Sequence, residues 1–243
     1  MVAEGQHLAA EALAAGARIH EAIVSPRLQR DARGQKTLLG LKAAGVTIRQ
    51  ASDTLLASLH EAESHQGILL IVERPETPVP HLIASAEGDA LVLVACGVQD
   101  PGNVGALVRL ADAAGATAMF VAGGADPFGP KAARASAGSI FRLPLARSSD
   151  MEGTLAFASA LRKRGLALAG AAAHGGVAHR EAPLHAPLAI FVGGEGAGLS
   201  EEIARAMDFR VTVPINPRVE SINVASAAAI LLFEAAARRG KRS

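Results

Sequence analysis

Three segments of the sequence follow apolar stretches and carry residue types that can bind or activate a ligand. They read DPGNVGALVR at 100–109, FVGGEGAGLS at 191–200 and VPINPRVESINVASAAAILLFEAAARR at 213–239. The second segment is rich in glycine, so its backbone N–H groups can approach a ligand closely around Glu195. The first segment carries Arg109 on a predicted helix. These three segments are the candidates for the functional site.

Helical spacing places Arg109 on the side of its predicted helix that faces away from the core. A core-facing stripe is predicted for Val104, Leu107, Val108 and Ala111, and the opposite side for Gly105, Arg109 and Asp112. Asn103, in the turn-forming DPGN segment, is the expected N-cap of this helix. Arg109 therefore either serves a ligand or is a solvated surface arginine, and the spacing leaves both interpretations open.

Several familiar catalytic motifs are missing. From Gly194 the sequence reads GEGAGL, which departs from the G-x-G-x-x-G of dinucleotide-binding sites, and no Lys-Ser/Thr follows to make a P-loop. G-x-S-x-G and H-E-x-x-H are also absent. His174, His179 and His185 are irregularly spaced in a Gly/Pro-rich stretch, so we expect surface histidines and no metal site. Cys96, at the end of an apolar run, is expected to be a small buried residue.

The elements that position the three segments are predicted to form an α/β fold. From residue 90 onward, apolar strands at 90–95, 118–123, 166–173, 188–194 and 209–215 alternate with helices near 104–114, 151–164, 200–207 and 222–239. Such alternation favours a mostly parallel sheet covered on both faces, with ligands at the carboxyl ends of its strands. The last helix is apolar nearly all round, so we expect it to be deeply buried.

The N-terminal part is predicted to be a separate, smaller α/β unit. Helices are expected at 3–15 and around 20–27, and a strand in GILLIVE at 67–73. The stretch at 74–89 contains three prolines and no sustained periodicity, which fits a loosely structured connection. We expect a first domain at 1–75, a linker at 76–88 and a second domain at 89–243.

Composition limits the class of protein. The 243 residues are 50% apolar and 19% charged, and no apolar run reaches the ~20 residues of a membrane span. The N-terminus lacks the features of a secretory signal, so a cytoplasmic protein without membrane attachment is expected. The net charge is only +1, but between 25 and 50 the basic residues outnumber one aspartate, and Arg27, Arg30 and Arg33 are candidate RNA-phosphate contacts. With no Trp or Tyr, stacking on splayed bases is not expected.

In order and spacing, DPGNVGALVR, VGGEGAGLS and VPINPRVESINVASAAAILLFE resemble the three motifs of the SpoU (TrmH-like) family of RNA 2′-O-ribose methyltransferases, within the SPOUT class. KAARASAGSIFRLPL at 131–145 is similar to the family segment between the first two motifs. EGQHLAAEAL, LKAAGVTI and ESHQGILLIVE are similar, more loosely, to the ribosomal-protein-like substrate-binding domain of many members.

The resemblance implies a trefoil-knotted C-terminal domain that binds S-adenosyl-L-methionine, a homodimer whose subunits together complete the active site, and no metal. It places the cofactor-binding residues at Gly193, Gly194, Glu195, Gly196, Val213, Ile215 and Ile222. It places the catalytic residues at Asn103, Arg109, Glu195, Ser221 and Asn223. Leu110 departs from the Thr or Ser that many members have after the arginine. Ribosomal RNA is the favoured substrate, and transfer RNA or a non-catalytic RNA-binding or ribosome-assembly role are the alternatives.

Methyl transfer to a ribose hydroxyl needs an aligned donor and a more nucleophilic acceptor. A guanidinium with a pKa above about 12 is a poor general base, so we expect Arg109 to orient the hydroxyl and to stabilise the developing alkoxide. Asn103 and Asn223 are expected to hold Arg109 and the loops in register. Glu195 would satisfy backbone donors or pair with Arg109, and Ser221 would cap the last helix or touch the substrate.

Overall fold

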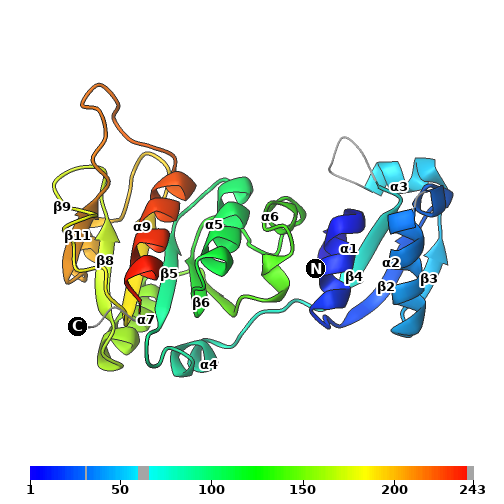
Figure 1. The fold of residues 1–243 in the computed structure, drawn as a ribbon, viewed down its shortest axis with the longest axis horizontal. Helices are drawn as coiled ribbons and strands as arrows, with labels where there is room; N and C mark the ends of the chain where they lie inside the picture. The colour runs from blue at the N-terminus through cyan, green and yellow to red at the C-terminus, as the bar shows by residue number, and fades with distance from the viewer. Residues whose placement is uncertain (31, 60–65, 240–243) are drawn as a thin grey trace.

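The computed structural model describes residues 1–30, 32–59 and 66–239, which fold around two β-sheets (Figure 1). The N-terminal sheet has the strand order β1-β4-β2-β3, and the C-terminal sheet has the order β7-β6-β5-β10-β8-β11-β9. In the described part of the chain, no helix combines the length and apolarity needed to span a bilayer.

The N-terminal sheet is mixed. Its strands are β1 (Val2–Glu4), β2 (Ile19–Val24), β3 (Thr47–Gln50) and β4 (Ile68–Val72), with β4 antiparallel to β1 and β2, and β2 parallel to β3. The helices are α1 (Gly5–Ala14), α2 (Ala32–Ala43) and α3 (Asp53–Leu59), with a 3₁₀ helix η1 at Pro26–Arg30. The helix predicted around 20–27 is wrong, because Ala22 and Val24 alternate with more exposed neighbours and face the core as strand residues do.

The C-terminal sheet is entirely parallel in its described pairings, which confirms the predicted fold class. Its strands are β5 (Leu91–Cys96), β6 (Ala118–Ala122), β7 (Leu145–Ser148), β8 (Ala167–Ala171), β9 (Val177–Ala178), β10 (Leu188–Gly193) and β11 (Phe209–Thr212). The strands β7 and β9 at the two edges were not predicted, because they are too short to show an apolar run.

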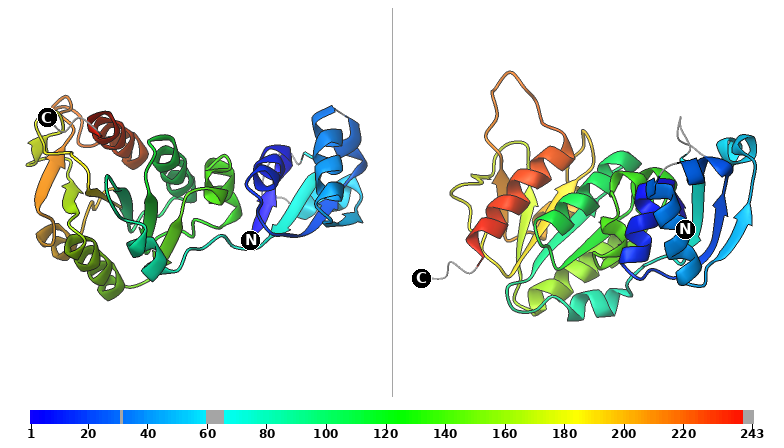
Figure 2. Two further views of the ribbon diagram at one scale, coloured as in Figure 1. Left: turned by 60° about the horizontal axis from the view of Figure 1, so that its bottom comes forward. Right: turned by 45° about the vertical axis from the view of Figure 1, so that its right-hand side comes forward.

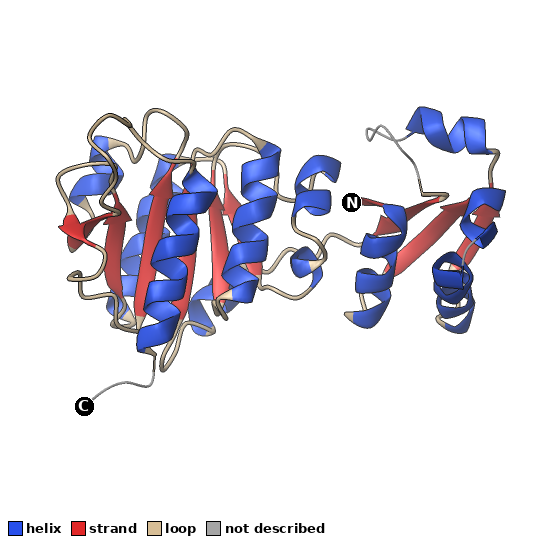
Figure 3. Cartoon of the chain, turned by 45° about the horizontal axis from the view of Figure 1, so that its top comes forward, coloured by secondary structure: helices blue, strands red, loops and turns tan. Residues whose placement is uncertain are grey.

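Helices cover both faces of this sheet (Figure 3). They are α5 (Pro101–Ala113), α6 (Pro130–Ala135), α7 (Met151–Lys163), α8 (Glu201–Arg205) and α9 (Val224–Arg238), with a 3₁₀ helix η2 at Ser139–Phe141. Alternate residues of β5 serve the two faces: Leu91 and Leu93 join the core cluster of α5 and α9, while Val92 and Val94 join that of α7. A strand buried on both faces reads as a continuous apolar run, as the sequence of β5 does.

The connection between the two sheets is more ordered than expected. Residues Val79–Ala84 form the helix α4, and its Leu82 is fully buried in the core cluster that includes Phe157. Glu76 also makes an isolated parallel β-bridge with Leu145 of β7. The expectation of a loosely structured connection is therefore wrong, because burial of Leu82 ties this segment to the larger sheet.

The segment from α6 to η2 contacts the N-terminal unit (Figure 2). Ala133 and Phe141 pack with the hydrophobic cluster of the smaller sheet. Arg134 forms an ion pair with Glu4 of β1, and Arg142 forms ion pairs with Glu11 of α1 and Asp112 of α5. Apolar packing and paired charges thus join the two sheets through this segment.

Candidate active site

Residues from the three candidate segments are joined by hydrogen bonds beside the carboxyl ends of β5 and β10. Asn103 Nδ2 donates to Glu195 Oε1 at 2.7 Å, and Asn223 Nδ2 donates to Asn103 Oδ1 at 3.0 Å. The backbone N–H of Gln99 donates to Glu195 Oε2 at 3.0 Å. Because β5 and β10 are adjacent, with Gly193 opposite Cys96, the loops that follow them meet at one edge of the sheet.

The hydrogen bonds favour the ionised form of Glu195. Burial by itself would raise the pKa of this carboxyl group, but the hydrogen bonds from Asn103 and from backbone amides, including that of Gln99, outweigh burial and lower the pKa. Glu195 is therefore an anion at neutral pH. Of the two alternatives for Glu195, the structure shows the first: the carboxylate accepts from a backbone donor, and its side-chain partner within the chain is Asn103 rather than Arg109.

Helix capping differs from the prediction at both helices. Asp100, not Asn103, caps α5, since its carboxylate accepts from the backbone N–H groups of Gly102 and Asn103. Asn223, not Ser221, caps α9, and its Oδ1 accepts from Ala225 N at 2.8 Å. Both helices are thus capped by other residues, which leaves the Asn103 side chain to bridge Glu195 and Asn223.

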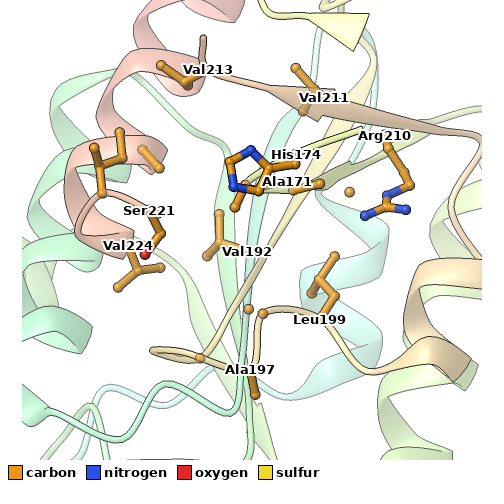
Figure 4. Close-up of a pocket in the computed structure, with 18 of the residues that line it drawn as sticks. Ala171, His174, Val192, Ala197, Leu199, Arg210, Val211, Val213, Ser221 and Val224 are labelled. Carbon is orange, nitrogen blue, oxygen red and sulfur yellow. The ribbon is translucent and has the colours of Figure 1, made fainter. Parts of the chain in front are cut away.

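A cavity of about 520 Å³ opens beside this network, between the turn after β10 and the segment before α9 (Figure 4). Apolar side chains from β10, β11 and α9, including Val192, Val211 and Leu231, form much of its wall. All of the residues predicted to bind the cofactor line it: Gly193, Gly194, Glu195, Gly196, Val213, Ile215 and Ile222. Ser221 and Asn223 line it too.

Glycine is required in the turn after β10 for two different reasons, which are lack of space for a side chain and a positive backbone φ. A Cβ at Gly193 would overlap the backbone of Gly198, and one at Gly194 would overlap the carbonyl oxygen of Gly97. At these two positions the chain itself, and not only a ligand, excludes a side chain. Gly196 lies in open space with φ of +83°, a conformation that glycine adopts without strain.

Arg109 lies outside this arrangement. Its side chain is exposed on α5, as the spacing predicted, but it does not line the cavity and makes no hydrogen bond or ion pair with any described residue. The expected contact of Asn103 and Asn223 with Arg109 is therefore not made within one chain. Gly105, predicted to share the polar side, is instead buried, because α6 packs directly against it. The packing is so close that a Cβ at Gly105 would collide with the backbone of Ala132.

The three arginines predicted to bind RNA meet at a second cavity, of about 630 Å³, on the N-terminal unit. Arg27, Arg30 and Arg33 line it together with Gln6 and Gln66. Arg30 lies 3.5 Å from Asp53, and Arg33 lies 3.2 Å from Nδ1 of His7. Asp31, the acidic residue of this basic stretch, and Glu63–His65 of the ESHQGILLIVE segment lie outside the described residues. Three arginines lining one concave site favour an anionic ligand.

Sequence reasoning missed two residues of the main cavity. His174 and Arg210 both line it, although the first was expected to be an ordinary surface histidine and the second carried no signal. Across the described residues, no cluster of three or more His, Cys, Asp or Glu side chains is placed to hold a metal ion. Cys96 is buried as expected, and burial raises the pKa of its thiol to about 12.

Comparison with known proteins covers both units. The SpoU rRNA methylase family model matches residues 90–233, and a model for RNA 2′-O ribose methyltransferase substrate binding matches residues 2–78. The chain is 32% identical over 231 residues to the 23S rRNA guanosine 2′-O-methyltransferase RlmP of Bacillus subtilis, covering 95% of this chain and 86% of that protein. It is 31% identical over 238 residues to RlmB of Ralstonia nicotianae, covering 97% and 94%.

Solved structures agree with the sequence comparison. The SpoU methyltransferase AviRb of Streptomyces viridochromogenes, in complex with AdoMet, superposes with a TM-score of 0.88 at 26% identity, covering 98% of this chain and 89% of that one. An AdoMet-bound rRNA methyltransferase of Sinorhizobium meliloti superposes with a TM-score of 0.82 at 28% identity, covering 97% and 86%. With the family model matching more than half of its length, this chain belongs to the SpoU rRNA methylase family.

Proposed function

We propose that this protein transfers a methyl group from S-adenosyl-L-methionine to a ribose 2′-OH of 23S ribosomal RNA. Two observations carry the proposal: hydrogen bonds among Asn103, Glu195 and Asn223 join the three family segments, and the second and third of these segments line one cavity. A ribosomal substrate makes the cytoplasm the expected compartment.

The cavity suits S-adenosyl-L-methionine in size and in chemistry. Its volume of about 520 Å³ lies within the range of small-molecule sites, and its apolar wall suits a purine ring. Exposed backbone groups of the 193–198 turn offer donors and acceptors for a ribose. The ionised Glu195 places a negative charge at the rim, which complements a cationic ligand. When bound, the cofactor supplies a methyl group already activated by its sulfonium charge.

In this proposal the network of Asn103, Glu195 and Asn223 holds the three loops in register around the reaction centre. Ser221, which lines the cavity and does not cap α9, is available to contact substrate or cofactor. Arg109 orients the acceptor hydroxyl and stabilises the alkoxide as it develops, because a guanidinium stays charged at neutral pH.

We propose that Arg109 acts across a homodimer, reaching the cavity of a second copy of the chain. Two observations support this arrangement. Arg109 is exposed on α5 and outside the cavity of its own chain, and α9, which packs beside α5, exposes Ile230 and Phe233 on one stripe. The prediction that α9 is deeply buried is wrong for the single chain, and a partner covering that stripe would restore its burial.

The N-terminal unit is proposed to hold the RNA, with domain limits of 1–75, 76–88 and 89–243. The cavity of Arg27, Arg30 and Arg33 supports a phosphate-binding role, and the substrate-binding family model spans 2–78. Within the larger unit, the turn after β10 and the segment before α9 are proposed to form the trefoil knot of the SPOUT class.

Coverage favours ribosomal over transfer RNA. The rRNA methyltransferase of Sinorhizobium meliloti covers 97% of this chain, whereas the A. aeolicus TrmH/SpoU tRNA modifying enzyme covers 66% with a TM-score of 0.54. The N-terminal unit is thus shared with an enzyme that acts on ribosomal RNA.

The direct test is transfer of labelled methyl from S-adenosyl-L-methionine to total RNA that lacks ribose methylation, followed by mapping of 2′-O-methylated nucleotides. A single methylated ribose in 23S RNA supports the proposal. A label in transfer RNA would show that transfer RNA, and not 23S RNA, is the substrate. Cofactor binding without transfer to any RNA, including intact ribosomal subunits, would support a non-catalytic role.

A further inference from the structure

An ion pair between two helices lies at the start of α5, next to the active-site network. Lys131 Nζ of α6 is 3.0 Å from Asp100 Oδ2. The other carboxylate oxygen, Asp100 Oδ1, accepts from the backbone N–H groups of Gly102 and Asn103, the latter at 3.1 Å. One carboxylate therefore holds both the first turn of α5 and the lysine of the neighbouring helix.

The position of Lys131 is set by the packing of α6 rather than by its own charge. Gly105 lets α6 lie directly against α5, since any Cβ there would collide with the backbone of Ala132. On the same short helix, Arg134 forms its ion pair with the buried Glu4 of the N-terminal sheet. Contacts with both units thus hold helix α6 in place, and the backbone of Lys131 is held within reach of Asp100.

Asn103 is the residue on which this ion pair acts. Its backbone N–H is held by Asp100, while its side chain donates to Glu195 and accepts from Asn223. A rotation of the first turn of α5 would move the Asn103 amide away from both partners at once. Small displacements of an aligning group cost far more in rate than in binding.

We propose that Lys131 and Asp100 are positioning residues of the methyl-transfer site: their ion pair fixes the first turn of α5 and so aims Asn103 between Glu195 and Asn223. This inference rests on the proposed function for its kinetic readout, and not for its spectroscopic one. A role in stability alone is a poor account of the pair, because the Lys131 and Asp100 side chains are 54% and 47% exposed and such pairs contribute little to folding.

The kinetic test compares Lys131→Met, Lys131→Arg and a control, Lys163→Met, which removes an exposed lysine from α7. We expect Lys131→Met to lower kcat by about tenfold or more, with the KM for RNA and the affinity for S-adenosyl-L-methionine unchanged. Lys131→Arg keeps the charge and the reach to Asp100 and should retain most of the activity. The control should behave as the parent protein does.

The pH dependence of kcat adds a readout that separates positioning from a direct charge effect. Loss of the Asn103 hydrogen bond removes one of the contacts that lower the pKa of Glu195, so this pKa should rise and activity should be lost at a higher pH on the acid side. Among the described residues, the backbone of Asp100 hydrogen-bonds to Glu195, Lys131 pairs with the Asp100 carboxylate, and His174 and Arg210 line the same cavity as Glu195. In Asp100→Ala, removal of a negative charge would by itself lower the pKa of Glu195, whereas loss of positioning raises it.

A spectroscopic test needs no activity. The chain contains three asparagines, Asn103, Asn216 and Asn223, so selective ¹⁵N-asparagine labelling gives three pairs of side-chain amide signals, one pair for each residue. In Lys131→Met we expect the signals of Asn103 and Asn223 to shift, while those of Asn216, which lies outside the network, stay in place as an internal reference.

The possible results separate the ideas cleanly. If the parent protein is active, a kcat of Lys131→Met equal to that of the parent would overturn the positioning role. Unshifted Asn103 and Asn223 signals in this variant would overturn it as well. A raised KM for RNA with unchanged kcat would make Lys131 a phosphate contact instead. If the parent protein neither binds S-adenosyl-L-methionine nor methylates RNA, the proposed function fails, while the asparagine signals still decide whether the ion pair orders the network.

Discussion

Asn223 performs two tasks with one side chain, and two substitutions can separate them. Its Oδ1 caps α9 by accepting from Ala225 N, while its Nδ2 donates to Asn103. Asn223→Ala removes both functions. Asn223→Ser keeps an N-cap oxygen of comparable quality but is too short to reach Asn103.

The stability cost follows from these contacts. Loss of an N-cap costs about 1 kcal/mol, and loss of an exposed side-chain hydrogen bond costs roughly 0.5 kcal/mol. Asn223→Ala should therefore destabilise the protein by about 1.5 kcal/mol, and Asn223→Ser by about 0.5 kcal/mol. For a chain of this size, 1 kcal/mol corresponds to about 2–4 °C in Tm. The expected falls in Tm are thus about 3–6 °C for alanine and about 1–2 °C for serine.

Activity should not follow stability. Both variants lose the donor to Asn103, so both should lower kcat by about tenfold or more at a temperature where each is folded. Calorimetric melting curves and methyl-transfer rates on the same preparations make the comparison. If serine lowers Tm as much as alanine does, the capping argument is wrong, and if serine keeps the parent kcat, the amide contact with Asn103 has no role in the reaction.

Three further predictions address the remaining parts of the site. Arg109→Ala should abolish methyl transfer and leave cofactor affinity nearly intact, because Arg109 is proposed to serve the acceptor hydroxyl and not the cofactor; parallel loss of cofactor binding would contradict its role at the acceptor. Changing Arg27, Arg30 and Arg33 together to alanine should weaken RNA binding and flatten its dependence on salt, and an unchanged slope would remove the phosphate-binding role. Gly105→Ala should lower Tm by several degrees, since overpacking between α5 and α6 costs about 1–3 kcal/mol; a raised Tm would show that helix propensity prevails.

Local sequence patterns were sufficient to predict strands that are buried on both faces and helices that bury one regular stripe. Continuous apolar runs predicted β5, β6, β8 and β10, because a strand covered on both faces needs apolar residues at every position. The core stripe of α5 was likewise predicted, with Val104, Leu107, Val108 and Ala111 all buried. Prediction failed where elements are short or half-exposed, as in β2, where the sequence pattern suggests a helix, and in α4, where it suggests a loosely structured connection.

The capping residues show a subtler failure. Asp100 and Asn103 lie three residues apart in one turn-forming segment, and either side chain can cap a helix. The choice depends on where the helix begins and on what else attracts each side chain. Lys131 holds Asp100 at the helix start, and Glu195 and Asn223 occupy the side chain of Asn103, so contacts from distant segments decided the assignment.

By itself the sequence determined the α/β fold class, the three segments of the site and the chemical types of their residues, because apolar periodicity and motif spacing are local properties of the chain. Only the tertiary structure decided which of those residues meet. Asn103, Glu195 and Asn223 are up to 120 positions apart in sequence yet share hydrogen bonds, whereas Arg109, six residues from Asn103, is turned to the outside of its helix. Parallel strand pairing brings the loops after β5 and β10 to one edge of the sheet, and the packing of α5 on its neighbours fixes which of its faces remains exposed.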